Sequence, residues 1–307
     1  MIANFFKKSK PVNIFNLVVL LLAFYLVSLF FVGITEFSLM FLLKKGFLFI
    51  FLFLFLMIEN FIVKKNNLTE GNSYTMLLSV LLIGAFYETM YSKTIIFSNI
   101  LLLLGYRKIY SIKSGIDVGR KLFDAGLWIG AAALIYPPSL LFGVLIFLAV
   151  AIYQKLYIQN FIIPIFGLAT PFLLFFTYSL YVENAELFYQ LFQFQYSLDF
   201  TAYHQLKYLI PLTLVLTITT WSILAVTPKI VQISNTLRLS WNVLLAQLVI
   251  ATVIIFFSPV KNGSEMLYLV FPCVVIITNF IQKSQSKNFK NLILYLFLLV
   301  AIGVYFL

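Results

Sequence analysis

Eleven apolar runs follow one another along this chain, and only short polar segments separate them. A helix needs about twenty apolar residues to cross a hydrocarbon core about 30 Å thick, and fewer where the bilayer is thin. No segment between the runs is long enough to fold independently in water. The sequence therefore predicts an all-α, polytopic bundle with about eleven crossings, forming a single integral membrane domain over residues 1–307. The runs cover residues 14–34, 46–63, 74–90, 94–106, 122–136, 139–154, 158–181, 208–226, 241–257, 266–281 and 291–307.

The composition is that of a membrane protein rather than of a soluble domain. Apolar residues make up 63% of the 307 positions and charged residues 10%, whereas a soluble domain has about 45–50% and about 25%. The net charge of +11 comes from basic residues in short clusters between the apolar runs, so nucleic acid is not an expected partner. The single cysteine, Cys273, lies inside an apolar run, which excludes a disulfide framework and a thiolate metal site.

The positions of the basic residues predict how the chain is oriented. Lys7, Lys8 and Lys10 precede the first run, which has the length of a retained signal anchor. If the N-terminus is cytoplasmic, 16 of the 21 Lys and Arg residues fall on the cytoplasmic side and 5 fall outside, in keeping with the positive-inside rule. This count requires the chain to turn back at Pro137-Pro138, because without that turn every later loop would change sides. Proline cannot continue a helix, which favours a helical hairpin there. The C-terminus is then on the outer side.

Six of the ten acidic residues fall on the outer side in this topology. Glu36 follows the first helix and Glu88 ends the third, so these two carboxylates are the candidate catalytic residues. One could act as a general base, or both could hold a divalent cation, although no cofactor is predicted. Two independent, solvated carboxylates are the alternative. His204 and Lys207 end the outer segment 182–207 and are candidates for contact with a phosphate or substrate.

Motifs for other chemistry do not occur in the sequence. The one histidine has no second imidazole nearby, and no spacing of His, Cys and acidic residues predicts a metal site. The glycine-rich phosphate-binding patterns and the nucleophile-elbow pattern are also absent. A soluble type of ATPase or dehydrogenase is therefore not expected.

Two segments between the runs are long enough to bind a partner. The basic segment 107–121 is predicted to be a cytoplasmic loop, either solvated beside anionic lipid or docking a protein through Arg107, Lys108 and Lys113. In segment 182–207, apolar residues recur at steps of three and four, which predicts an amphipathic helix on the outer surface. These residues are Leu187, Leu191, Phe194 and Leu198.

Two acidic residues near the inner ends of helices have structural interpretations. Glu59 lies about one turn before Lys64 and is expected to reach the headgroup region. Asp124 lies near the start of the fifth run, where the helix dipole favours a carboxylate. Neither is expected to relay protons, because carboxylates with that role lie near the bilayer midplane.

Residues 73–154 resemble the first half of the multi-pass glycosyltransferases that use polyprenyl-phosphate sugars, the GT-C type. The resemblance rests on an outer turn, YETMYSK, a basic stretch, GYRKIY, and a glycine-rich helix that ends at a proline turn, GLWIGAAALIYPPS. Gly126 and Gly130 in that helix have the four-residue spacing that permits close helix contact. The resemblance implies a reduced GT-C-like bundle.

The same resemblance implies roles for outer residues. Glu36 would be the base that activates the acceptor, Glu88 a second carboxylate, and His204 or Lys207 would lie beside the lipid phosphate. The first outer loop, 35–45, is much shorter than the loop of that family and lacks its characteristic residues.

The chain is also similar, over most of its length, to a flavobacterial (Bacteroidota) family of multi-pass inner-membrane proteins with no known activity. The similarity rests on the opening Lys8-Ser9-Lys10-Pro11 and on the LFDAG and YPPSLLF blocks. It implies a location in the bacterial inner membrane. In that membrane, the orientation from the basic residues gives a cytoplasmic N-terminus and a periplasmic C-terminus.

Three functions remain open, so whether the protein is an enzyme is undecided at this point. The first is a non-catalytic scaffold or accessory subunit of a cell-envelope assembly, which contacts lipid and a protein partner. The second is a glycosyltransferase-like enzyme that handles a polyprenyl-phosphate-linked sugar at the outer face. The third is a transporter whose helices break at Pro164, Pro171, Pro211 and Pro272, although no internal repeat supports it. The scaffold is the leading prediction, because the enzyme rests on fold-level analogy.

Overall fold

The structure, a computed structural model, describes residues 2–32, 38–193, 196–233 and 235–307. Within these ranges the chain is helical and contains no β-strand. Eight helices in them are long and apolar enough to cross a membrane, which agrees with the predicted bundle of membrane helices. Two further apolar helices are shorter, α4 (Tyr74–Ala85) and the segment Pro137–Ile152. A third, α6 (Val118–Ile135), begins with charged residues.

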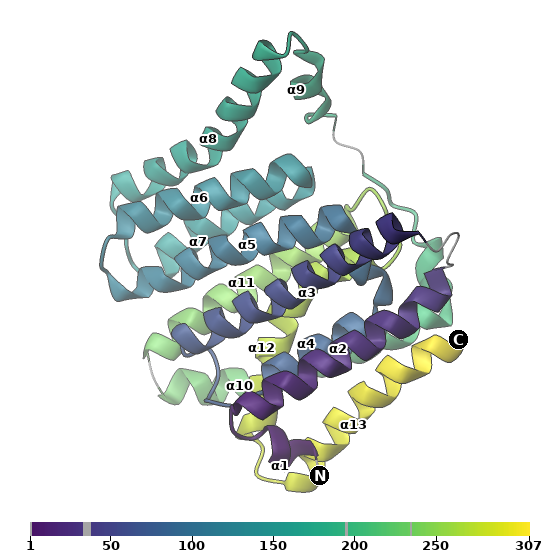
Figure 1. Ribbon diagram of the computed structural model, residues 1–307. Helices are drawn as coiled ribbons and strands as arrows, with labels where there is room; N and C mark the ends of the chain where they lie inside the picture. The colour runs from purple at the N-terminus through teal and green to yellow at the C-terminus, as the bar shows by residue number, and fades with distance from the viewer. Residues whose placement is uncertain (1, 33–37, 194–195, 234) are drawn as a thin grey trace. The chain divides into compact units, whose positions relative to one another are not determined.

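The chain forms two compact units (Figure 1). The first unit consists of residues 1–96, 199–233 and 261–307, and the second of residues 97–198 and 234–260. Besides α4, the helices of the first unit are α1 (Ile2–Phe6), α2 (Pro11–Val32), α3 (Leu39–Lys65), α10 (Leu206–Ile233), α12 (Leu267–Lys283) and α13 (Lys287–Gly303), with the 3-10 turns η1 (Tyr87–Met90), η4 (Thr201–His204), η5 (Ser264–Met266) and η6 (Val304–Phe306). Besides α6, the helices of the second unit are α7 (Gly143–Ile152), α8 (Ile158–Tyr181), α9 (Glu186–Gln190) and α11 (Asn235–Phe256), with the 3-10 turns η2 (Ile112–Ser114) and η3 (Pro137–Phe142). The helix α5 (Lys93–Ser111) belongs to this unit from residue 97 onward.

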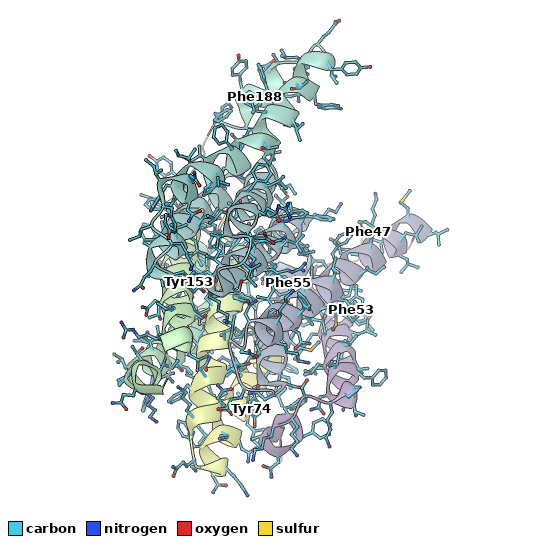
Figure 2. The ribbon with its side chains drawn as sticks, turned by 90° about the vertical axis from the view of Figure 1, so that its left-hand side faces the viewer. Phe47, Phe53, Phe55, Tyr74, Tyr153 and Phe188 are labelled. Atoms are coloured by element: carbon cyan, nitrogen blue, oxygen red, sulfur yellow. The ribbon has the colours of Figure 1, made fainter. Side chains whose placement is uncertain are left out.

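The core of the first unit is the pair α4 and α12. Every residue of α4 is buried, and α12 is buried over almost its whole length. α12 packs against α4 and α10, while α2, α3 and α13 also pack against α4. On α3, Phe55 is fully buried, whereas Phe47 and Phe53 are 55% and 37% exposed (Figure 2). These outward aromatic side chains suit contact with lipid.

In the second unit, α6 and α8 are in backbone contact because three glycines line their crossing. A Cβ atom on Gly126 would lie 2.5 Å from the carbonyl oxygen of Pro164, and one on Gly167 would lie 2.3 Å from the carbonyl oxygen of Phe123. Gly130 is equally close to the backbone of α8. The close contact predicted from Gly126 and Gly130 is therefore confirmed, and its partner helix is α8.

The predicted hairpin at Pro137-Pro138 is present. The two prolines follow α6 and open the turn η3, which leads into α7. The Nζ atom of Lys155, which follows α7, lies 3.5 Å from the position that a Cβ atom of Gly115 would take, close before α6. The end of α7 therefore returns to the start of α6.

The expected helix breaks at four prolines do not occur. α8 continues through Pro164 and Pro171, α10 through Pro211, and α12 through Pro272. A proline removes one backbone hydrogen bond, but in a membrane helix neighbouring groups satisfy the freed carbonyl. The discontinuous helices on which the transporter interpretation relied are absent at these positions.

The basic segment 107–121 is mostly helical instead of a loop. α5 continues to Ser111, the turn η2 follows, and α6 begins at Val118, so residues 115–117 alone separate the helices. Lys121 donates hydrogen bonds to the Ser111 carbonyl oxygen (2.9 Å) and to the Ser114 hydroxyl (2.7 Å), which stabilises this tight connection.

The amphipathic helix expected in segment 182–207 is much shorter than predicted. α9 covers Glu186–Gln190, and the described residues from 191 to 200 are not helical; Phe194 of the expected apolar stripe lies outside the described residues. The physical reason is aromatic packing. The Phe188 ring contacts the Phe176 ring of α8 at 4.9 Å between centroids, so the chain folds back on α8 instead of extending as a helix.

We expect Gly126→Ala to destabilise the protein, because the added Cβ would collide with backbone atoms of α8, which cannot move aside as a flexible side chain can. Overpacking of this kind costs about 1–3 kcal/mol. The thermal unfolding midpoint in mild detergent measures the effect. Gly46→Ala is the matched control, because a Cβ there meets no atom within 4 Å, and alanine favours a helix over glycine. Equal midpoints for the two variants would contradict the described crossing.

Candidate functional site

The structure brings together two of the residues that the sequence singled out, Glu88 and Lys207. Glu88 lies on η1, just after α4, and its side chain is 16% exposed. Its Oε1 atom accepts hydrogen bonds from the Lys207 Nζ atom at 3.1 Å and from the Tyr208 hydroxyl at 2.6 Å. The donors are consecutive residues at the start of α10. One carboxylate therefore joins two segments that are more than a hundred positions apart.

The Lys207 ammonium group is also held by aromatic side chains. It lies 4.5 Å from the ring centroid of Tyr208 and 5.6 Å from that of Tyr87, and its Nζ atom is 3.4 Å from the Tyr87 hydroxyl. Cations are attracted to the electron-rich faces of aromatic rings. These contacts place the ammonium group against the Glu88 carboxylate.

A second carboxylate, Glu265, lies in the same part of the first unit. It belongs to η5, is fully buried, and accepts a hydrogen bond from the Tyr203 hydroxyl of η4. The Tyr203 ring in turn contacts the Tyr208 ring at 6.0 Å. Sequence reasoning placed Glu265 on the outer side but did not select it. The signal that could have found it is its position at the start of an otherwise uncharged apolar run.

Gly263 lies in the turn that contacts Tyr208 and Glu88. Its φ of +86° is a conformation that residues with a Cβ atom rarely adopt. A Cβ atom there would lie 2.7 Å from the Tyr208 ring and 3.5 Å from the Glu88 Oε2 atom. The turn before α12 therefore lies directly against Tyr208 and Glu88. We call Glu88, Tyr203, Lys207, Tyr208, Gly263 and Glu265 the Glu88 cluster.

Of the remaining outer candidates, the His204 side chain has no hydrogen bond or ion pair with the described residues of this cluster. His204 is exposed and lies within electrostatic range of Asp199. The backbone N–H of Thr201 donates to the Asp199 Oδ1 atom at 2.9 Å and, as the main cause, holds the pKa of that carboxyl group below its usual value. Glu36 lies outside the described residues.

In the second unit, the predicted docking residues are partly engaged. Lys108 forms an ion pair with Asp124 at 2.6 Å between Nζ and Oδ2. Asp124 was interpreted as a carboxylate held by the helix dipole, and its partner is instead a lysine from α5. Arg107 and Lys113 are half-buried. The Lys108 ammonium group is therefore already engaged within the second unit.

Glu59 is buried inside the first unit, whereas the sequence predicted that it reaches the headgroup region. It is 1% exposed, and its Oε1 atom accepts a hydrogen bond from the Ser79 hydroxyl at 2.8 Å. The expectation from the sequence was wrong because α4, which carries Ser79, packs against this face of α3. The distance of Glu59 from the helix end did not reveal that cover.

The Glu88 cluster connects several segments of the first unit. The Glu88 Oε1 atom accepts two donors, and the Oε2 atom lies on the side of Gly263. Among the described residues, no group of three or more His, Cys, Asp or Glu side chains could hold a metal ion. The cluster joins η1, η4, η5 and the start of α10.

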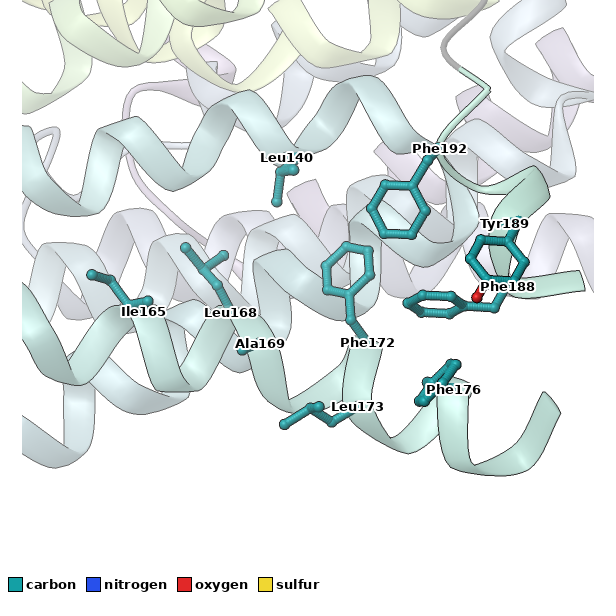
Figure 3. Close-up of a pocket in the computed structure, with 10 residues that line it drawn as sticks. All are labelled: Leu140, Ile165, Leu168, Ala169, Phe172, Leu173, Phe176, Phe188, Tyr189 and Phe192. Atoms are coloured by element: carbon teal, nitrogen blue, oxygen red, sulfur yellow. The ribbon is translucent and has the colours of Figure 1, made fainter. Parts of the chain in front are cut away.

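The second unit has an apolar groove of about 570 Å³ between α8, α9 and η3. Figure 3 shows Phe172 and Phe176 of α8 facing Phe188 and Phe192 across it. Leu140 and Ile165 also line the groove. Its lining suits an aliphatic chain or the apolar side chains of a partner, because burying such groups removes them from water.

Comparison with known proteins yields one match. Residues 5–307 match the family that is described as a family of unknown function, DUF6427. No curated protein and no solved structure matches the chain.

We expect the Glu88–Lys207 pair to contribute coupled stability. Glu88→Gln and Lys207→Gln should each lower the unfolding midpoint, and the double variant should lose less than the sum of the two. For groups in contact the coupling energy is about 0.5–3 kcal/mol. The midpoint in mild detergent is the measurement. Glu183→Gln, at an exposed carboxylate, is the control and should change nothing; strict additivity of the pair would show that the two side chains do not interact.

Proposed function

We propose that this chain, which belongs to the family of unknown function DUF6427, is a non-catalytic scaffold or accessory subunit of a cell-envelope assembly in the bacterial inner membrane. The observation that carries the proposal is the arm formed by α8 and α9. The membrane-spanning window of α8 is only 17% buried. The arm also exposes the aromatic side chains of Tyr181 (86%) and Tyr189 (61%), and Tyr196 beyond α9 is 69% exposed. Such residues are enriched at protein interfaces.

The state of the candidate catalytic residues supports the same proposal. Glu88 is engaged by Lys207 and Tyr208, and His204 is exposed without joining them. The polar end of the first unit therefore favours anchoring of helices over turnover of a substrate. The arm is the surface that we propose for recognition of a protein partner.

Contacts within the first unit support the pairing of segments in the proposed topology of eleven crossings, while the cytoplasmic N-terminus rests on the count of basic residues. At one end, the backbone N–H of Ser9 donates to the Gly71 carbonyl oxygen at 3.1 Å, and the Asn279 side chain donates to the Leu68 carbonyl oxygen at 2.9 Å. Positive-inside counting assigns all of these segments to the cytoplasm. At the other end, the Glu88 cluster joins segments that the count assigns to the outside.

The second unit supports the same assignment. Lys121 and Ser111 meet at an end that the count places inside. The Tyr136 hydroxyl and the Ser258 hydroxyl meet, at 2.7 Å, at an end that it places outside. Each contact joins two segments that are predicted to lie on the same side of the membrane. If one helix between two such segments did not cross the membrane, they would lie on opposite sides and could not meet.

Cysteine labelling tests this topology. Gln285→Cys and Glu183→Cys introduce thiols at exposed positions next to helix ends, and the native Cys273 is buried and needs no replacement. In spheroplasts, a membrane-impermeant maleimide should label the cysteine at position 183, and the cysteine at position 285 only after permeabilisation. The reverse pattern would invert the topology, and labelling of both in intact spheroplasts would remove at least one crossing.

Capture of a partner tests the scaffold. A photo-crosslinking amino acid at Tyr189 should attach the protein to a defined envelope protein, which then co-purifies in mild detergent at constant ratio. Tyr189→Ser with Tyr196→Ser should remove that protein, because both side chains are exposed on or beside the arm. Phe30→Ser, which removes an equally exposed aromatic side chain from α2, should retain it. A monodisperse protein without a crosslinked partner would contradict the proposal.

Handling of a lipid-linked sugar is the second candidate, and the apolar groove favours it because its lining and volume suit an isoprenoid chain. The Glu88→Gln variant described above distinguishes the two. An enzyme of this kind would lose an envelope glycan in Glu88→Gln or Glu36→Gln at unchanged protein level. A scaffold would keep the glycan in every variant that still binds its partner.

A further inference from the structure

The first unit carries a basic cavity of about 310 Å³ at the turn between α1 and α2. Three lysines line it, Lys7, Lys8 and Lys10, together with Asn4, Phe5, Val12 and Asn13. No acidic side chain is among these residues. The cavity therefore concentrates positive charge in a small, partly enclosed space.

The turn that forms the cavity is held in place by a buried side chain. Asn13 is 1% exposed and donates hydrogen bonds from Nδ2 to the Phe5 carbonyl oxygen at 3.0 Å and to the Lys8 carbonyl oxygen at 2.8 Å. The backbone of Ser9 is tied to Gly71 at 3.1 Å. The lysines thus extend from a preorganised backbone, which reduces the entropy lost when a ligand binds.

A further lysine adds to the positive potential around the cavity. Lys290 of α13 lies within range of the charge of Lys7, and the carboxylate of Glu70 also acts on it. The Lys290 Nζ atom donates to the Gln282 carbonyl oxygen at 3.4 Å.

The lining of the cavity is amphiphilic. Phe5 and Val12, which lie beside the lysines, are 48% and 59% exposed. The cavity is at the N-terminal end of α2, which is one of the candidate membrane spans. A ligand at this depth would meet ammonium groups on one side and apolar side chains on the other. A phospholipid combines these features, because its phosphate is joined to acyl chains.

We propose that this cavity binds the phosphate of an anionic phospholipid, with Lys7, Lys8 and Lys10 as donors and Phe5 and Val12 against the first acyl carbons. The shared chemistry is a phosphate group held by ammonium groups, and the source is the lipid headgroup. This site is separate from the arm that carries the proposed function. It would tie the N-terminal turn to the lipid composition of one leaflet.

The experiment titrates the purified full-length chain in mild detergent with short-chain phosphatidylglycerol and follows the thermal unfolding midpoint. The midpoint should rise by several degrees, because a ligand that binds the native state stabilises it. Lys7→Gln with Lys10→Gln should weaken the apparent affinity by about tenfold or more, since each lysine near an anionic lipid contributes about 1 kcal/mol. The matched control is Lys64→Gln with Lys65→Gln, which removes the same charge from exposed residues of the first unit that do not line the cavity.

The outcomes separate the sources of the phosphate. Retained affinity in the Lys64/Lys65 control, with lost affinity in the Lys7/Lys10 variant, supports the site. An equal loss in both variants would reduce the effect to net charge and overturn it. The same stabilisation by phosphatidylcholine, or by inorganic phosphate at equal concentration, would also overturn the assignment to an anionic lipid. Midpoints without lipid, compared among the variants, show that each one is folded before titration.

Discussion

Inside a hydrocarbon layer, every backbone N–H and carbonyl group must find its partner within the protein, because no water is available. Helices meet this requirement within their own segment, and the eight long apolar helices among the described residues follow from it. The same constraint explains why α8, α10 and α12 run through their prolines, since a break would free more backbone groups than the proline already does. The charged side chains that carry the recognisable chemistry of this protein, Glu88, Lys207 and Glu265, lie at helix ends.

At those ends, side chains connect helices that the backbone alone would leave independent. On one side of the first unit, the Glu88 carboxylate accepts hydrogen bonds from Lys207 and Tyr208, and the Glu265 carboxylate accepts one from Tyr203. At the N-terminal turn, lysines line a cavity, and hydrogen bonds from the Asn13 side chain fix the backbone of that turn. The first arrangement satisfies its charges internally and suits anchoring, whereas the second leaves positive charge unpaired and suits a ligand. This difference in charge balance separates the structural cluster from the proposed lipid site.

The proposed scaffold and the lipid site place different demands on the chain. Docking of a protein needs an apolar surface that remains uncovered, and the arm of α8 and α9 offers aromatic side chains and a groove for this purpose. Binding of a headgroup needs fixed positive charge beside apolar groups, which the α1–α2 turn provides. Because the two sites use different residues, loss of one should leave the other intact.

The sequence by itself determined the helical class, the positions of most helices and the hairpin at Pro137-Pro138, because apolar run length and proline act locally. It also indicated the close contact of Gly126 and Gly130, though without α8 as their partner. Only the tertiary structure decided that Glu88 pairs with Lys207, that Glu59 is covered by α4, and that α9 ends after five residues. Each of these depends on which helices become neighbours, and that choice is made by packing between segments far apart in the chain, where no local pattern records it.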